Sequence, residues 1–152
     1  MDNSSESINQ LVKILSKTPA FSGKGAERFL EWWWKKPLED RKKFLEEWTD
    51  FTHIGFCSQC FYFSRESLCR FCLDADRDQR TVCLTVSPFA VDIIERNSDF
   101  KGLYFVLGEE ASGHHNLKKI KIIRARIEKL KDFINKKNVE ELILATDRKS
   151  VV

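Results

Sequence analysis

The stretch from Cys57 to Cys72 reads CSQCFYFSRESLCRFC and contains two C-x-x-C pairs separated by eight residues. Each C-x-x-C spans one tight turn, so both of its sulfurs can point at one centre. Two such turns supply four thiolates, the ligand set of a tetrahedral all-sulfur metal site. Because protein sulfur then fills all four positions, none remains for a reactive water. The sequence therefore predicts one structural zinc ion bound by Cys57, Cys60, Cys69 and Cys72.

Three other interpretations of these cysteines are chemically open. A chance grouping of reduced thiols is disfavoured because paired C-x-x-C motifs at short spacing are typical of metal sites. A redox-active pair is disfavoured because two pairs are present and no strand precedes the first one. An iron–sulfur cluster also takes four thiolates, and the ligand set alone does not distinguish it from zinc.

The composition indicates a folded chain in a reducing compartment. Its 152 residues are 42% hydrophobic and 32% charged, with a net charge of +3 that permits a polyanionic partner without requiring one. The opening MDNSSESINQ lacks the features of a secretory signal, and no apolar run approaches the roughly 18 residues of a membrane span. We therefore expect a cytoplasmic protein with reduced thiols, in which Cys83 is a small buried hydrophobe.

The N-terminal part has the pattern of two helices joined by a glycine-containing turn, followed by a third helix. Residues 8–16 repeat apolar positions with helical spacing, and a turn is expected from Pro19 through Gly25. A second helix follows at AERFLEWWW, and Pro37 opens a third that runs to about Thr52. The three consecutive tryptophans of the second helix lie about 100° apart, so they cannot all face one core.

The segment Ser22-Gly23-Lys24-Gly25 is a candidate phosphate contact. Small glycines let the backbone approach a ligand closely, and the N-terminus of the following helix offers unpaired N–H groups. Lys24 adds a positive charge. The alternative is an ordinary turn between two helices.

The C-terminal part alternates strands and helices, which predicts a parallel sheet with right-handed crossovers. A polar loop at 108–116 contains His114 and His115, for which a surface position is the simplest explanation. The basic residues of the long helix are expected to form a solvated face. The expected elements are strand TVCLTV, a helix from Pro88, a strand within 99–107, a helix at 117–136 and a strand at 141–145.

The order of these parts resembles the RecR family of bacterial recombination mediators. The matching segments are CSQC…CRFC, DRDQRTVCLTV, SPFAVDIIERNSDFKGLYFVLG and EELILAT, and the resemblance covers about residues 8–146. It implies a multi-part α/β protein with a helix-hairpin-helix module at 1–54, a four-cysteine zinc motif at 55–75 and an incomplete Toprim domain with a parallel sheet at 76–146.

The resemblance also implies a function in DNA repair without catalysis. Members of the family assemble into dimers or tetrameric rings that can encircle DNA. They act with RecO, and in some bacteria RecF, to load RecA on gapped DNA coated by single-strand-binding protein. The hairpin contributes to DNA binding, which corresponds to Gly23, Lys24 and Gly25 here, the zinc is structural, and the Toprim surface receives RecO.

Two positions depart from the family pattern. The glutamate usual near the end of the first Toprim strand is replaced by Val86, and the following aspartate by Ala90. Valine cannot bind magnesium or move a proton, so Toprim phosphoryl chemistry is not expected. The competing hypotheses are a Toprim nucleic-acid enzyme, which Val86 disfavours, and a zinc-stabilised adaptor that binds only protein.

The last six residues, DRKSVV, differ from the Asn-Pro that usually follows ILAT in the family. They are a translation of GATCGGAAGAGCGTCGTG, the start of a widely used sequencing adapter. Our hypothesis is that residues 147–152 are an assembly artefact and that the natural gene continues.

Overall fold

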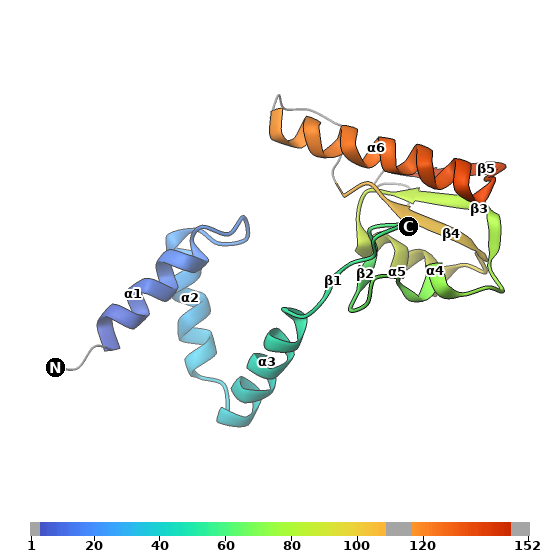
Figure 1. Cartoon of the computed structure of the whole chain (residues 1–152). Coiled ribbons are helices and arrows are strands. Elements are labelled where there is room, and N and C mark those ends of the chain that lie inside the picture. Colours follow the sequence, from blue (N-terminus) through green and yellow to red (C-terminus); the bar gives the residue numbers. More distant parts are fainter. Residues whose placement is uncertain (1–3, 109–116, 147–152) are drawn as a thin grey trace. The chain divides into compact units, whose positions relative to one another are not determined.

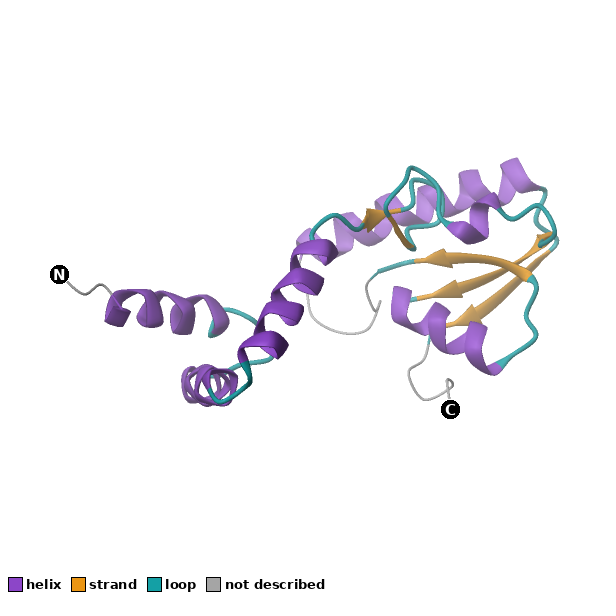
Figure 2. Ribbon diagram, turned by 90° about the horizontal axis from the view of Figure 1, so that it is seen from below, coloured by secondary structure: helices purple, strands orange, loops and turns teal. Residues whose placement is uncertain are grey.

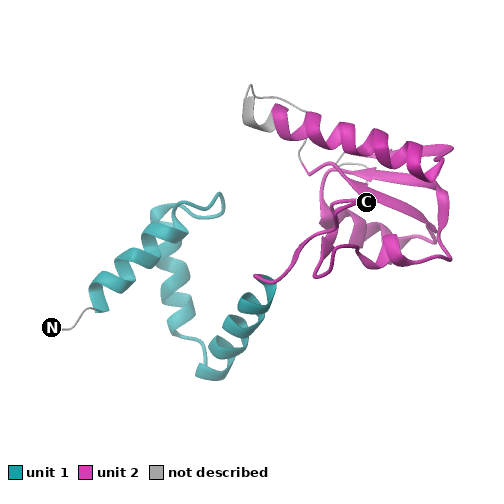
Figure 3. Cartoon of the chain, in the orientation of Figure 1, with its two compact units in different colours: residues 1–51 teal, residues 52–152 magenta. Residues whose placement is uncertain are grey.

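The computed structural model describes residues 4–108 and 117–146 (Figure 1). The chain divides into two compact units, residues 1–51 and 52–152, which are coloured separately in Figure 3. No helix in the described ranges is both long enough and apolar enough to cross a membrane.

The first unit contains three helices: α1 (Ser4–Leu15), α2 (Gly23–Trp34) and α3 (Leu38–Phe51). Aromatic rings hold α2 to α3, because the ring centroids of Trp33 and Phe44 lie 4.8 Å apart in an edge-to-face arrangement. The neighbouring Trp32 and Trp34 are 50% and 76% exposed. The three tryptophans therefore face different directions, as the helical spacing predicts.

The second unit begins with a short antiparallel hairpin, β1 (Gly55–Phe56) and β2 (Phe63–Ser64), and the single-turn helix α4 (Arg70–Leu73). The predicted alternation of strands and helices follows. Pro88 occupies the first turn of its helix, and the Oγ of Ser87 accepts a hydrogen bond from the Phe89 N–H as its cap. The elements are β3 (Asp78–Thr85), α5 (Pro88–Asn97), β4 (Gly102–Val106), α6 (Leu117–Lys137) and β5 (Glu141–Ala145).

The first of these strands starts earlier than its hydrophobic pattern predicts. The segment LDADRDQR was expected to be a charged loop, but β3 begins within it at Asp78. The backbone N–H of Asp78 donates to the carbonyl oxygen of Lys101 at 2.9 Å, and that of Glu140 donates to Arg80 at 2.8 Å. Pairing of the main chain on both sides therefore extends the strand into polar sequence.

The three strands form one parallel sheet in the order β4-β3-β5, and their arrows point the same way in Figure 2. The first crossover runs from β3 to β4, and the second runs back from β4 past β3 to β5. Because the two crossovers run in opposite directions across the sheet and both are right-handed, they place α5 and α6 on opposite faces. Figure 1 shows α5 and α6 on either side of the sheet. Neighbouring side chains of β4 confirm that the two helices cover opposite faces of the sheet. The hydroxyl of Tyr104 donates a hydrogen bond to Glu95 of α5, whereas the ring of Phe105 packs 5.7 Å from that of Phe133 in α6.

Burial follows from this layering. Strand β4 is covered on both faces, and every residue from Leu103 to Val106 is at most 1% exposed. Cys83 in β3 is 3% exposed, which confirms the prediction of a small buried hydrophobe. Strand β5 forms an edge of the described sheet, and Leu144 is 66% exposed.

Candidate metal centre

The four cysteines of the two C-x-x-C turns converge on one point. Their sulfur atoms all lie within 4.8 Å of one another, with 3.7 Å between Cys57 and Cys72 and 3.4 Å between Cys60 and Cys69. These separations are too long for a disulfide, which holds its sulfurs about 2.0 Å apart. A tetrahedral zinc with bonds of about 2.3 Å would place its sulfurs about 3.8 Å apart. The arrangement therefore fits one zinc ion with four thiolate ligands.

Backbone hydrogen bonds shape both metal-binding turns. The Phe61 N–H donates to the carbonyl oxygen of Cys57 at 3.0 Å, and the Cys72 N–H donates to that of Cys69 at 3.0 Å. Phe61 has a φ of +61°, a left-handed conformation that closes the first turn. The second turn continues directly into α4, for which Cys69 is the N-cap residue.

The mutual hydrogen bonds of these thiols change their acidity. Hydrogen bonds with Cys60, and then with Cys69 and Cys72, hold the pKa of Cys57 below its usual value, while hydrogen bonds with Cys57, Cys69 and Cys72 raise the pKa of Cys60. A bound dication would favour ionisation of all four thiols. By contrast, burial alone raises the pKa of Cys83 to about 11, so this thiol stays protonated.

The metal-binding turns are joined to the parallel sheet. The Val106 N–H in β4 donates to the carbonyl oxygen of Cys60 at 2.8 Å. The ring of Phe61 meets that of Phe105 edge to face at 5.5 Å, and the guanidinium of Arg126 lies 4.6 Å above the Phe61 ring. The zinc motif is therefore part of the same packed unit as β4 and α6.

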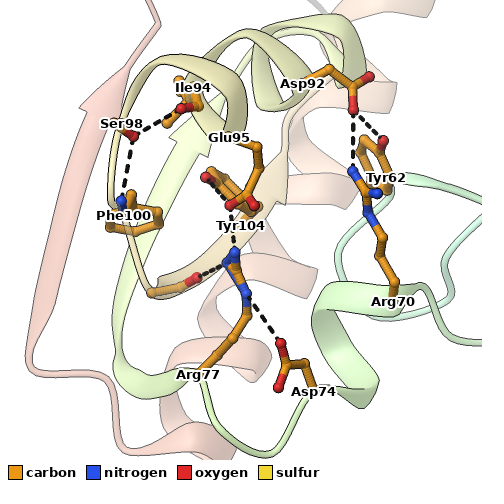
Figure 4. A network of polar contacts seen from close by, with 11 residues as sticks. Tyr62, Arg70, Asp74, Arg77, Asp92, Ile94, Glu95, Ser98, Phe100 and Tyr104 are labelled. Atoms are coloured by element: carbon orange, nitrogen blue, oxygen red, sulfur yellow. Dashed lines mark hydrogen bonds and ion pairs between the residues drawn. The ribbon is translucent and has the colours of Figure 1, made fainter.

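A buried arginine makes a second connection, shown in Figure 4. Arg77, whose side chain is 8% exposed, donates to the carbonyl oxygen of Gly102 at 2.8 Å and to the carboxylate of Glu95. Its guanidinium also lies over the rings of Phe71 and Tyr104, at 4.8 and 5.5 Å. One cation thus connects the end of the zinc motif to α5 and β4.

A second, smaller network of polar contacts lies beside that of Arg77 in Figure 4. The hydroxyl of Tyr62 donates to Asp92 at 2.6 Å, and Arg70 lies 3.6 Å from the same carboxylate. Burial, followed by the hydrogen bond to Asp92, raises the pKa of Tyr62 to about 12. Burial and the bond to Glu95 likewise raise the pKa of Tyr104.

The glycines singled out in the sequence lie in a helix rather than in the preceding turn. Helix α2 begins at Gly23, and the Oγ of Ser22 accepts a hydrogen bond from the Gly25 N–H at 3.1 Å. The expected turn through Gly25 is therefore wrong at its end, because the Ser22 cap starts the helix before the glycines. Gly23 and Lys24 are exposed in the first helical turn.

The described carboxyl ends of the parallel strands carry no acidic residue. β3 is followed by Val86, β4 by Leu107 and Gly108, and β5 by Thr146. Glu109, Glu110, His114 and His115 lie outside the described residues. Among the described residues, the four cysteines form the single cluster suited to a metal ion.

The roles of Arg77 and Arg126 were missed from the sequence. Arg77 belongs to the DRDQR segment that marks the resemblance, which was the available signal, but its partners lie 18 and 25 residues away. Arg126 is one of many basic residues on a helix. Only the folded arrangement separates it from the others, by turning it toward Phe61.

These features define a zinc-finger α/β protein with a helical N-terminal unit and a partial Toprim-like sheet. Residues 54–74 match the family model for the four-cysteine zinc finger domain of RecR. The chain is 32% identical to the recombination protein RecR of Syntrophotalea carbinolica over 147 residues, covering 93% of this chain and 70% of the relative. It is 33% identical to the proteins of the same name in Chlamydia trachomatis serovar D and Myxococcus xanthus, covering 92% of this chain and 70% of each relative. The chain belongs to the RecR family of recombination proteins.

Proposed function

We propose that this chain is a DNA-binding recombination mediator in gap repair, acting with RecO-like and RecF-like partners to help load RecA on single-stranded DNA. The observation that carries the proposal is the identity of 32–33% with recombination proteins over more than nine-tenths of the chain. The all-thiolate zinc site supports a structural rather than a catalytic metal, because it leaves no coordination position for a reacting water.

The proposed DNA contact is formed by Gly23, Lys24 and Gly25. The first N–H groups of a helix have no carbonyl partner within it and favour phosphate. The Gly25 N–H is already capped by the Oγ of Ser22, so the proposed phosphate contact uses the N–H groups of Gly23 and Lys24, and Gly25 contributes by its small size. A side chain at Gly23 would meet no atom within 4 Å, so the backbone there is open to an approaching strand. Lys24 is exposed and would add a phosphate contact.

The protein is proposed to have no catalytic activity of its own. Magnesium-assisted phosphoryl transfer in a Toprim sheet needs an acidic residue after the first strand, and Val86 stands there. A magnesium-dependent nicking or primer-synthesis assay tests this directly. Activity that disappeared on deletion of residues 82–146 would replace the mediator proposal with a Toprim enzyme.

Self-association is the third part of the proposal, as a dimer or a tetrameric ring. The first unit exposes large aromatic side chains, including Trp34 and Trp48 at 76% and 60%. Exposed apolar surface of this kind is typical of interfaces. Sedimentation over a range of concentrations would detect the association.

A reconstituted loading assay tests the function. Gapped DNA coated with single-strand-binding protein is mixed with RecA and a RecO-like protein, and the lag before RecA hydrolyses ATP is measured with and without this chain. We expect the wild-type chain to shorten the lag, and we expect the lag with the Lys24→Gln variant to lie between that with the wild-type chain and that without any chain. A lag that the wild-type chain leaves unchanged argues against the mediator role. Binding to the RecO-like protein without binding to DNA would favour a protein-only adaptor.

A further inference from the structure

Positive charge is concentrated on α6. The helix sequence LKKIKIIRARIEKLKDFINKK contains nine lysines and arginines but only two acidic residues, a net charge of +7. Since the whole chain carries +3, the residues outside α6 together carry −4. This separation of charge sets the helix apart from the rest of the molecule.

The described basic residues are not spread evenly around the helix. Leu130 and Phe133 are 8% and 6% exposed and face the sheet. Arg126 is turned toward Phe61, where its guanidinium lies over the ring. The opposite, outward face exposes the basic residues Lys121, Arg124, Lys129, Lys131 and Lys136.

Few of these outward charges are neutralised within the protein. Lys131 pairs with Glu128 at 2.8 Å. In the part of the chain that the structure describes, Lys121, Arg124, Lys129 and Lys136 form no ion pair. The same face also exposes two acids: Glu128 lies four residues from Arg124, and Asp132 lies three and four residues from Lys129 and Lys136. These acids lower the charge of the face without cancelling it, and the remaining excess of positive charge is available to an anionic partner.

We propose that the outward face of α6, defined by Lys121, Arg124, Lys129 and Lys136, binds the phosphate backbone of double-stranded DNA. The inference rests on the proposed function and adds a second contact surface to the one at Lys24. Charge complementarity is the argument for the partner, because a polyanion gains affinity by releasing counterions when lysines and arginines approach its phosphates.

The makeup of the face favours duplex over single-stranded DNA. Single-strand binding sites combine positive charge with aromatic rings on which bases stack. The one aromatic residue of α6, Phe133, is buried against the sheet. From Lys121 to Lys136 the helix rises about 22 Å, enough to follow roughly six base pairs of duplex backbone.

The test compares two variants of the zinc-loaded chain that lose the same charge. One carries Lys121→Gln, Arg124→Gln and Lys129→Gln on α6. The control carries Arg65→Gln, Arg96→Gln and Lys101→Gln at exposed positions of the same unit outside α6. Fluorescence anisotropy with a labelled 30-base-pair duplex measures affinity over a series of salt concentrations.

We expect the α6 variant to bind about tenfold or more weakly near 100 mM salt. The slope of log affinity against log salt should become shallower by about three, since each phosphate contact contributes about one. The control should keep the wild-type slope within about one, and both variants should retain bound zinc and a cooperative melting transition.

Equal slopes for the α6 variant and the control would overturn the inference while leaving the proposed function in place. If the α6 variant lost affinity only for single-stranded DNA and bound duplex DNA as the wild type does, the inference would also be overturned. A wild-type chain that binds gapped DNA only through Lys24, and shows no affinity for continuous duplex, contradicts the second surface. Absence of any DNA binding by the wild-type chain contradicts both proposals.

Discussion

The backbone N–H of Val106 donates a 2.8 Å hydrogen bond to the carbonyl oxygen of Cys60, which joins a metal-ligand residue to strand β4. The first metal-binding turn therefore lies alongside the edge of β4 that β3 does not occupy. Because unpaired strand edges promote association with other chains, this contact protects one side of the sheet. Metal binding and sheet stability should consequently be coupled.

Replacing one zinc ligand tests that coupling. Cys69→Ser should reduce zinc from about one ion per chain to well below it, since the binding energy of such sites contributes directly to folding. Mass spectrometry of the metal content and a melting curve provide the measurement. The matched control is Cys83→Ala, which removes a buried cysteine outside the cluster and should keep its zinc. A Cys69→Ser protein with full metal content and an unchanged melting curve would remove this cysteine from the site.

Glu95 should contribute more to stability than an exposed carboxylate in a similar ion pair. Glu95→Gln removes the closer of the two carboxylates beside the buried Arg77 and leaves Asp74 at 3.8 Å, which should lower the free energy of unfolding by about 2 kcal/mol. Glu140→Gln breaks the pair with Arg80, whose side chains are 65% and 66% exposed, and should cost less than about 1 kcal/mol. Urea unfolding measures both values. Equal losses for the two variants would show that the Arg77 network does not act as a buried charge pair.

Two glycine-to-alanine substitutions should change the stability of the fold in opposite directions. Gly108 has a φ of +80°, and a Cβ there would lie 2.6 Å from the Cζ of Arg126. Gly108→Ala should therefore destabilise the second unit by about 1–3 kcal/mol. Gly23 begins α2 with open space around it, so Gly23→Ala should be neutral or stabilise by up to about 1 kcal/mol. Melting curves that show the same sign for both would contradict this description of Gly108.

Buried tyrosines should make the fold sensitive to alkali. The pKa of Tyr62 is raised to about 12, above the value of about 10 expected in an unfolded chain. The unfolded state then loses its proton first, so the contribution to stability is present below about pH 10 and is lost as the pH rises toward 12. Tyr62→Phe should flatten this decline in stability measured by urea titration at each pH. A variant with the wild-type pH dependence would show that Tyr62 does not contribute to it.

Much of the fold was predictable because local signals agreed with one another. The cysteine spacing alone indicated a four-ligand site, and Pro88 after an apolar run marked the start of α5. The alternation of strands and helices then predicted a parallel sheet, which is confirmed by the register of β3 with both of its neighbours.

The remaining features depend on contacts between distant parts of the chain. Glycines usually indicate a loop, but the Ser22 cap outweighs that preference and starts α2 at Gly23. The Arg77–Glu95 pair spans 18 residues, and sequence spacing does not show which acid an arginine will meet. Likewise, nothing local distinguishes Arg126, which packs on Phe61, from the outward-facing Arg124 two positions earlier.

The most direct test of the account is equilibrium binding of the zinc-loaded chain to gapped duplex DNA as a function of salt. The account predicts clear binding near 50 mM salt and a loss of affinity by orders of magnitude on reaching about 200 mM, because phosphate contacts dominate. Lys24→Gln should weaken binding to all sequences alike and make the slope shallower by about one. A wild-type chain with intact zinc that does not bind gapped DNA at low salt would contradict the proposal that it is a DNA-binding recombination mediator.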